Sequence, residues 1–247
     1  MVINRWWGLF RSLLVYHNPI RTWPWRAFYR QLLNPGDLAF DVGAHVGSRA
    51  LAMSASGVKV IAIEPQPLFA KFLRRFLPKK ILVLEVAVGG SDAEAALAVS
   101  SLHPTLASLR TDFVAQTSSA PGFEHVRWDS EQIVKMVTLD ALIHVHGTPR
   151  YLKIDVEGFE LEVLSGLATS IEIISVEYLP AFPSLTEAVL SRLTELGDYR
   201  FNAIVGEKPE FLWDKWHDVS QVRSWLETLP KDARSGDLFA RLVNEKN

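Results

Sequence analysis

The stretch of residues 37–47, with the sequence DLAFDVGAHVG, constrains what this chain can fold into more than any other segment. Its apolar run at residues 38–42 predicts a strand that is buried on both faces, as in a parallel sheet. Gly43 and Gly47 then let the backbone approach a ligand and the following helix, which we expect over residues 48–56. The amino end of that helix presents unpaired N–H groups, so the stretch predicts a ligand site.

The spacing of the glycines argues against a dinucleotide. The fingerprint G-x-G-x-x-G needs glycine at the positions that His45 and Ser48 occupy here, so a pyrophosphate cradle is disfavoured. A second apolar strand at residues 58–63 instead ends at Glu64, which Pro65 follows. An acidic side chain at this place can accept hydrogen bonds from both hydroxyl groups of a ribose. One ribose without phosphates points to S-adenosylmethionine; the alternative is that both segments are ordinary strand ends of an α/β protein.

Length and composition favour a single domain of ordinary charge. A chain of 247 residues, 48% of them hydrophobic, can bury one sizeable core. The net charge of −2 gives no global reason to expect nucleic-acid binding, and the absence of cysteine excludes disulfides and cysteine-based zinc sites. No apolar run reaches the ~18 residues that a membrane-spanning helix needs. We therefore expect a cytoplasmic protein.

Residues 1–32 form an arm of unusual composition. Tryptophan and arginine are enriched in it, and the first acidic residue of the chain is Asp37. Apolar residues recur at helical spacing over residues 6–14, and we expect Pro19 and Pro24 to break that helix. The arm could pack on the domain or close its active site. It could instead lie in a membrane interface, with arginine near anionic lipid, which would make the protein peripheral to the membrane, or it could hold an anionic substrate.

The segments after Glu64 predict half of a doubly wound α/β sheet. A helix with one apolar face is expected at residues 67–77, and it crosses over to a third strand at residues 81–88. Ala87 and Val88, at the end of that strand, should lie near an adenine ring. Periodicity degrades over residues 91–130, which we interpret as an insertion on the substrate side. Short strands or loops are expected within it at residues 95–100, 108–114 and 125–128.

A second stretch, residues 151–160 with the sequence YLKIDVEGFE, concentrates ionisable side chains in a strand. Alternation along the strand places Lys153 and Asp155 on one side, with Glu157 beyond them. Charges in a central strand need partners or a cleft, because an unpaired buried charge is costly. In an open α/β sheet the cleft lies at the carboxyl ends of the strands, so we expect these residues to face the bound ligand.

The remaining segments complete the sheet. Their patterns predict a strand from residue 134 and, after it, a helix that is capped near Thr138 or Asp140 and ends at Gly147. A second helix is expected from residue 159 or 160 to Gly166, followed by a strand at 171–177 and a helix at 185–196. The last expected elements are a strand at 199–205, a helix at 219–229 and a strand at 237–243. The last two strands lack a clear crossover pattern between them, which favours an antiparallel edge strand. The helix at 219–229 weakens that inference slightly.

Five short motifs occur in a fixed order along the chain. They are DVGAHVG at residues 41–47, EPQP at 64–67, VTLD at 137–140, LKIDVEGFE at 152–160 and VE at 176–177. Together they resemble the FkbM family of S-adenosylmethionine-dependent methyltransferases, over a region from about residue 33 to residue 177. The chain departs from the family at His45, where asparagine is common, and near residues 78–80, where an asparagine often ends the second helix.

The resemblance implies a fold, an activity and a set of contacts. The fold is α/β, a Rossmann-like class I methyltransferase domain over residues 33–247 with a mostly parallel seven-stranded sheet, an antiparallel edge strand and helices on both faces. The activity is methylation of a hydroxyl group on a small molecule, often a sugar or a secondary metabolite. The residues that would bind the cofactor are Asp41, Gly43, Ala44, His45, Gly47, Ser48, Glu64, Pro65, Ala87 and Val88.

Methyl transfer to a hydroxyl group needs alignment and a base. The acceptor oxygen must lie about 3 Å from the methyl carbon, opposite the sulfur, with water excluded. A hydroxyl is a poor nucleophile, so a carboxylate should take its proton during attack. Asp155 is the first candidate for this base and Glu157 the second, and Lys153 would pair with them or orient the acceptor. The alternative is that Lys153 and Asp155 form a structural ion pair.

Metal binding and two other functions are alternatives to, or additions to, methyl transfer to a hydroxyl group. Asp155, Glu157 and Glu177 could bind Mg²⁺ only if their carboxylates converge, so we predict no metal site. His144 and His146 point away from each other on a helix, which argues against a shared metal there. A nucleic-acid methyltransferase would need a basic, aromatic track, which only the arm offers. The other alternative is a non-catalytic, cofactor-binding protein associated with the membrane.

Overall fold

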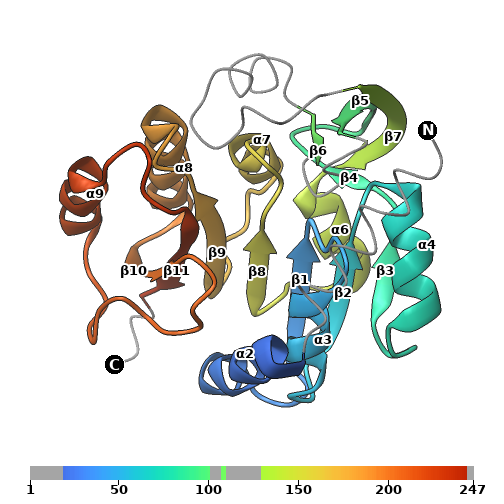
Figure 1. Cartoon of the computed structure of the whole chain (residues 1–247), viewed down its shortest axis with the longest axis horizontal. Helices are drawn as coiled ribbons and strands as arrows, with labels where there is room; N and C mark the ends of the chain where they lie inside the picture. The colour runs from blue at the N-terminus through green and yellow to red at the C-terminus, as the bar shows by residue number, and fades with distance from the viewer. Residues whose placement is uncertain (1–18, 101–106, 110–128, 244–247) are drawn as a thin grey trace.

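The computed structural model describes residues 19–100, 107–109 and 129–243, and these form a seven-stranded sheet beside a smaller one (Figure 1). The order of the main sheet is β10-β11-β9-β8-β1-β2-β3, so β1, the strand that precedes the glycine turn, lies near the middle of the sheet. Its strands are β1 (Leu38–Val42), β2 (Lys59–Ile63), β3 (Leu82–Leu84), β8 (Tyr151–Ile154), β9 (Ile173–Tyr178), β10 (Tyr199–Val205) and β11 (Gly236–Leu242).

The strand directions confirm the predicted sheet. β1 is parallel to β2 and β8, and the parallel pairing continues from β2 to β3 and from β8 to β9. β11 is antiparallel to both of its neighbours, β9 and β10. The antiparallel strand therefore lies at the expected edge of the sheet, one position inside the outermost strand β10. This mostly parallel arrangement is the one that the resemblance to class I methyltransferases implied.

Helices cover both faces of the main sheet, as expected (Figure 1). On one face lie α2 (Pro19–Leu32), α3 (Ser48–Ser54) and α4 (Pro67–Phe76), whose apolar side chains share a buried cluster with Val60 and Phe239 of the strands. On the other face lie α6 (Leu139–His146), α7 (Glu160–Ser165), α8 (Pro183–Leu196) and α9 (Val219–Thr228), which pack around Phe40 and Leu152. The two apolar clusters explain why the central strands are buried on both sides.

Capping groups set the ends of these helices. Thr138 caps α6, because its hydroxyl accepts a hydrogen bond from the N–H of Ala141 at 3.1 Å, and the helix ends at Gly147 as predicted. Asp218 caps α9 by accepting from the N–H of Gln221 at 2.9 Å, while the Gln221 side chain accepts from the N–H of Asp218. The first residues of α6 and α9 are therefore set by capping side chains that lie next to them in the sequence.

The predicted third strand is divided between the two sheets. β3 stays in the main sheet, whereas β4 (Ala87–Val88) pairs with β7 (Ser130–Val137) of the smaller sheet. The smaller sheet has the order β4-β7-β5-β6 and includes β5 (Ala93–Val99) and β6 (Ala107–Ser108). One strand over residues 81–88 was therefore a wrong prediction. The apolar run suits either sheet, so periodicity does not mark the break, which occurs where Glu85 turns to bind Arg74 of α4.

The smaller sheet accounts for most of the predicted insertion that the structure describes. β5 corresponds to the strand expected at 95–100, and it pairs antiparallel with β7, which begins four residues before the predicted strand start at 134. The strands expected at 108–114 and 125–128 lie almost entirely outside the described residues. Figure 1 shows this sheet beyond the arrowhead of β1, next to the carboxyl ends of the central strands.

The described part of the amino-terminal arm is α2, which packs on the domain. Trp25, Phe28 and Tyr29 are buried, and the ring of Phe28 lies 5.6 Å from that of Phe239 in β11. Pro24 lies inside α2 and does not break it, contrary to the prediction, because the buried aromatic residues that follow stabilise the helix. The helix expected at residues 6–14 lies outside the described residues. Within the described ranges no helix has the length and apolar character to cross a membrane.

Candidate functional site

A cleft, called here the first cleft, opens at the carboxyl ends of β1, β2 and β8. The space between its walls, counted out to the open mouth, is about 1040 Å³. It brings together the two stretches of sequence that were predicted to carry chemistry. The predicted site residues that line it are Asp41, Gly43, Ala44, His45, Ser48, Glu64, Pro65, Ala87, Val88, Lys153, Asp155 and Glu157.

The two glycines of the turn after β1 serve packing as much as a ligand. Gly43 has a φ of 80°, and a Cβ placed on it would overlap the backbone carbonyl oxygen of Asp155. Gly47, with a φ of 78°, does not line the first cleft; a Cβ there would lie 2.8 Å from side-chain carbons of Leu73 in α4 and of Leu77 just after it. Only glycine fits both positions, because the left-handed backbone and the close approach each disfavour a side chain.

Glu64 follows the last residue of β2 and its carboxylate reaches back to the glycine turn. Its side chain is buried, and its two oxygens accept hydrogen bonds from the N–H groups of His45 at 2.8 Å and Gln66 at 2.9 Å. Burial raises the pKa of Glu64 to about 7, although the two N–H donors partly oppose this shift. Each oxygen keeps a further lone pair, so the carboxylate can still accept from a hydroxyl group in the cleft.

Asp41, on β1, is the most enclosed carboxylate of the first cleft. It is 1% exposed, and neither carboxylate oxygen makes a hydrogen bond of good geometry to a described residue. Burial raises the pKa of Asp41, and the positive charge of Lys153 on the neighbouring strand β8 opposes that shift. A buried carboxylate without a donor is costly, so this group suits a ligand that brings its own N–H or O–H donors.

Lys153 and Asp155 form an ion pair, as one of the two interpretations of the sequence held. The Lys153 Nζ lies 2.7 Å from Oδ2 of Asp155. Burial opposes the charged form of each group, but Lys153 lowers the pKa of Asp155, and Asp155 with Asp41 raises the pKa of Lys153. The Lys153 side chain is only 3% exposed, whereas that of Asp155 is 39% exposed. The pair therefore holds an ionised carboxylate at the surface of the cleft.

Glu157 and Glu160 lie on the turn that follows this pair. Glu157 has a positive φ of 53° and lines the first cleft; burial, then the charges of Asp155 and Glu160, raise the pKa of its carboxyl. Glu160 accepts hydrogen bonds from the N–H groups of Val156 at 3.2 Å and Gly158 at 3.1 Å. Burial raises the pKa of Glu160 to about 7 despite these donors. Glu160 thus fixes the turn, and Glu157 is the carboxyl group presented to the cleft.

A second cleft adjoins the first and lies between α2, the turn after β10 and the start of β11. Ser48, Arg49, Asp155 and Glu207 line both clefts, so these four residues form the passage between them. The remaining ionisable residues of the second cleft are Glu177, Lys208, Glu210, Arg234 and Asp237. Acidic side chains outnumber basic ones in this list, so the second cleft favours a neutral or cationic ligand over a strongly anionic one.

Arg49 fixes one wall of the passage. Its guanidinium lies 3.2 Å from the centre of the Trp25 ring in α2 and donates to Oε2 of Glu207 at 2.6 Å. The Arg49 side chain is 12% exposed, whereas that of Glu207 is 65% exposed. Because Glu207 is held by a guanidinium that is itself stacked on tryptophan, the turn after β10 is tied to both α2 and α3.

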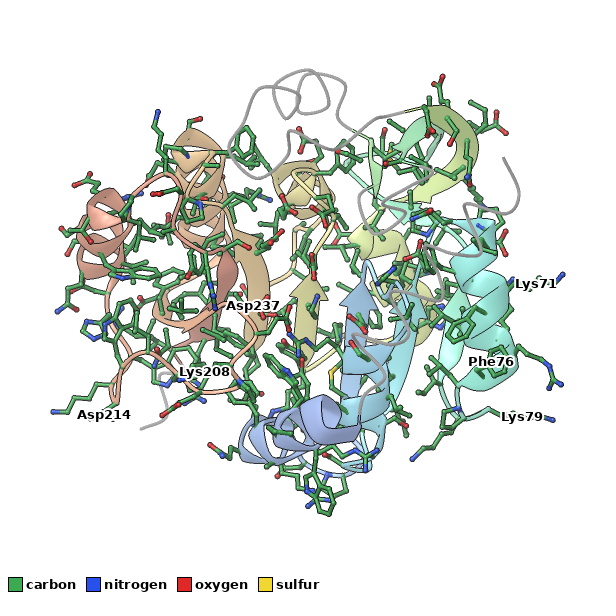
Figure 2. All side chains as sticks on the ribbon, in the orientation of Figure 1. Lys71, Phe76, Lys79, Lys208, Asp214 and Asp237 are labelled. Atoms are coloured by element: carbon green, nitrogen blue, oxygen red, sulfur yellow. The ribbon has the colours of Figure 1, made fainter. Side chains whose placement is uncertain are left out.

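Three carboxyl groups lie in a row across the floor of the second cleft. Asp237 of β11 is the register partner of Glu177 at the end of β9, and Asp155 follows β8 on the other side of β9. Burial raises the pKa of both Glu177 and Asp237. Figure 2 labels Asp237 among the side chains of this part of the molecule. In the described ranges, no three acidic or histidine side chains converge as metal ligands would.

Sequence comparison identifies the family. The model of the family described as "Methyltransferase FkbM domain" matches residues 41–233, which is most of the chain. The chain belongs to the FkbM methyltransferases. The resemblance inferred from the five motifs is thereby confirmed, and the matched region extends past residue 177 to residue 233. Among curated proteins, none matches this sequence significantly.

Solved structures resemble this FkbM methyltransferase only distantly. A TehB-like SAM-dependent methyltransferase from Corynebacterium glutamicum gives a TM-score of 0.47 at 10% identity, over 95% of this chain and 94% of that chain. An O-methyltransferase from Bacillus cereus in complex with SAH gives 0.44 at 11% identity, over 96% and 90%. Fibrillarin from Aeropyrum pernix with natively bound S-adenosyl-L-methionine gives 0.45 at 9%, over 87% and 76%. The fold assignment therefore rests on the strand order and not on these structures.

Sequence reasoning predicted Ser48 and Asp155 of the second cleft but missed most of its other charged residues. Arg49, Glu207 and Asp237 were not proposed as site residues, although all three line that cleft. Arg49 could have been found, because it follows Ser48 directly and therefore lies in the first turn of the helix after the glycine turn. Glu207 and Asp237 carry no local signal, because tertiary packing alone brings their segments beside the FkbM motifs.

Proposed function

We propose that this methyltransferase moves the methyl group of S-adenosylmethionine to a hydroxyl group of a small molecule, such as a sugar or a glycosylated metabolite or lipid. The observation that carries the proposal is the pair of buried carboxylates, Asp41 and Glu64, at the ends of adjacent strands on the first cleft. Between them lies a glycine turn that lacks the second and third glycines of a pyrophosphate cradle. The pair suits a ligand with a ribose and a cationic group but no phosphates.

The residues of the first cleft fit this cofactor in chemical type. Glu64 would accept hydrogen bonds from the ribose hydroxyls, which would favour its ionised form. Asp41 would accept from the ammonium end of the cofactor, the kind of donor that its unpartnered oxygens need. Ala87 and Val88, at the junction with the smaller sheet, offer an apolar wall to the adenine. When bound, the cofactor supplies a methyl group on a sulfonium, which is open to attack by an oxygen nucleophile.

The second cleft would hold the acceptor, and Asp155 would act where the two clefts meet. Asp155 is ionised through its pairing with Lys153 and partly exposed, so its free oxygen lone pairs can orient an acceptor hydroxyl and take its proton during attack. Glu157 is the second candidate base. The carboxyl groups of Glu177 and Asp237 would bind further hydroxyls of the acceptor, which favours a polyhydroxylated molecule over an anionic one.

Calorimetric titration with S-adenosylmethionine tests the proposal. We expect micromolar binding by the wild type and at least tenfold weaker binding by Glu64→Gln, which keeps the shape of the side chain but loses the charged acceptor. Glu227→Gln on the exposed face of α9 is the matched control and should bind as the wild type does. No binding by folded wild-type protein, or equal binding by both variants, would contradict the assignment of the first cleft.

A further inference from the structure

The chain carries a concentrated positive charge outside both clefts. Residues 65–91 contain Lys71, Arg74, Arg75, Lys79 and Lys80 but only one acidic residue, Glu85, although the whole chain has a net charge of −2. All five basic residues are exposed, and none of them lines the first or the second cleft. The charge therefore has no evident role in binding the cofactor or the acceptor.

Only some of these basic side chains make ion pairs or hydrogen bonds with described residues. Arg74 pairs with Glu85, and the Nζ of Lys80 donates to the backbone oxygen of Ser54 at 2.7 Å. Lys71, Arg75 and Lys79 make no ion pair with any described residue. Figure 2 shows Lys71, in the middle of α4, and Lys79, beyond its end, projecting from the same side of the molecule. These three cations face solvent, and the guanidinium of Arg75 also lies 5.9 Å from the centre of the Phe76 ring.

Two large apolar side chains are exposed among these cations. Phe76, the last residue of α4, is 66% exposed, and Leu82, the first residue of the edge strand β3, is 45% exposed. Figure 2 shows Phe76 on the same side as Lys71 and Lys79. We call this surface the α4 patch, and it consists of Lys71, Arg74, Arg75, Phe76, Lys79, Lys80 and Leu82. Exposed phenylalanine and leucine beside lysine and arginine combine apolar burial with electrostatic attraction, the two forces that hold proteins at a membrane interface.

Helix electrostatics explains only part of the α4 patch. Basic residues in the last turn complement the helix dipole, and this accounts for Arg74 and Arg75. It does not account for Lys79, which lies beyond the helix, or for Lys71 one turn earlier. Phe76 packs on the ring of Phe72, with 4.7 Å between the ring centres, yet it stays 66% exposed while its neighbours Leu73 and Leu77 are buried. The patch therefore calls for an external partner.

The side chains of the α4 patch favour lipid over nucleic acid. Residues 67–88 contain no serine, threonine, asparagine or glutamine, so the surface lacks the neutral polar groups that contact sugars and base edges. What it offers is positive charge for anionic headgroups and apolar side chains for the layer beneath them. We propose that the α4 patch docks this methyltransferase on an anionic membrane surface, with Phe76 and Leu82 inserted between headgroups that Lys71, Arg75 and Lys79 neutralise.

Vesicle co-sedimentation of the full chain tests the proposal. The wild type should sediment with vesicles of phosphatidylcholine and phosphatidylglycerol in a 70:30 ratio at low salt, and should stay in solution with phosphatidylcholine alone. Replacing Arg75 and Lys79 together by glutamate should weaken binding about tenfold or more. The matched control replaces Lys215 and Lys231 by glutamate. Both lysines are exposed and make no ion pair with a described residue, so the control changes the net charge equally and should bind as the wild type does.

A second variant separates insertion from charge. Phe76→Ala keeps every charge of the patch, and we expect it to weaken binding several-fold and to make the remaining binding more sensitive to salt. Thermal melts of each variant establish that it is folded. Equal binding by the patch variant and the control would overturn the proposal and assign any membrane contact to the arm, which is intact in both. No binding of the wild type to anionic vesicles would overturn it as well.

A duplex DNA gel shift at the same salt completes the test. Membrane docking would be refuted if the wild type bound DNA but not vesicles, and if replacing Arg75 and Lys79 abolished the DNA binding. That result would show that the patch binds nucleic acid instead. The proposal does not depend on the assignment of the first cleft. Titration with S-adenosylmethionine should give the same affinity for the wild type and the patch variants, so failure of one proposal leaves the other standing.

Discussion

The burial of Glu64 makes the stability of the ligand-free protein depend on pH in a way that one substitution should remove. The pKa of its carboxyl is about 7 in the folded chain against an ordinary value of 4.5, because burial penalises the charged form. Between these two pH values the folded state binds more protons than the unfolded state. Stability from this group is therefore fully present below pH 4.5 and is lost as the pH rises through 7.

The size of the effect follows from the shift. A difference of about 2.5 pKa units corresponds to about 3 kcal/mol of unfolding free energy, most of it lost between pH 5 and pH 8. Glu64→Gln removes the titration but keeps the shape of the side chain and one oxygen acceptor for the N–H groups of His45 and Gln66. The variant should lose stability at pH 5 and regain about 3 kcal/mol relative to the wild type by pH 8.

Urea denaturation followed by tryptophan fluorescence at intervals from pH 5 to pH 8 measures this difference. The quantity to compare is the difference between wild type and variant at each pH, because other buried carboxyl groups such as Glu160 titrate equally in both proteins. Glu227→Gln, on the exposed face of α9, should give a constant difference. A constant difference for Glu64→Gln too would refute the argument that burial raises the pKa of Glu64.

Two further predictions concern the turn after β1 and the ion pair at the cleft. Gly43→Ala should lower the free energy of unfolding, measured by urea denaturation, by at least about 3 kcal/mol, because the new Cβ would overlap the carbonyl oxygen of Asp155. The control Gly36→Ala, at a φ of 93° and with nothing within 4 Å of the new Cβ, should lower it by only about 1 kcal/mol. Equal losses in the two variants would contradict the steric argument. Asp155→Asn should bind S-adenosylmethionine within about threefold of the wild type but transfer methyl at least about 100-fold more slowly to an acceptor found by screening hydroxylated compounds, and unchanged turnover would remove Asp155 from the role of base.

The central sheet and the first cleft could be predicted because their information is local. A buried strand, a turn that only glycine fits and a carboxylate at a strand end each leave a mark within a few residues of sequence. The residues around Asp41, Glu64 and Asp155 therefore meet on the first cleft as expected. The break between β3 and β4 left no such mark, because the apolar residues on both sides of Glu85 suit either sheet.

The second cleft resists prediction from a single sequence because its contacts join distant segments. Trp25, Arg49 and Glu207 belong to three elements far apart in the chain, yet the guanidinium stacks on the tryptophan and binds the carboxylate. Neither contact follows from periodicity or from a motif; both depend on α2 packing beside α3 and on β11 entering the sheet between β9 and β10. Substitutions in α2 or in the turn after β10 can therefore reshape the second cleft while the motifs of the first cleft stay the same.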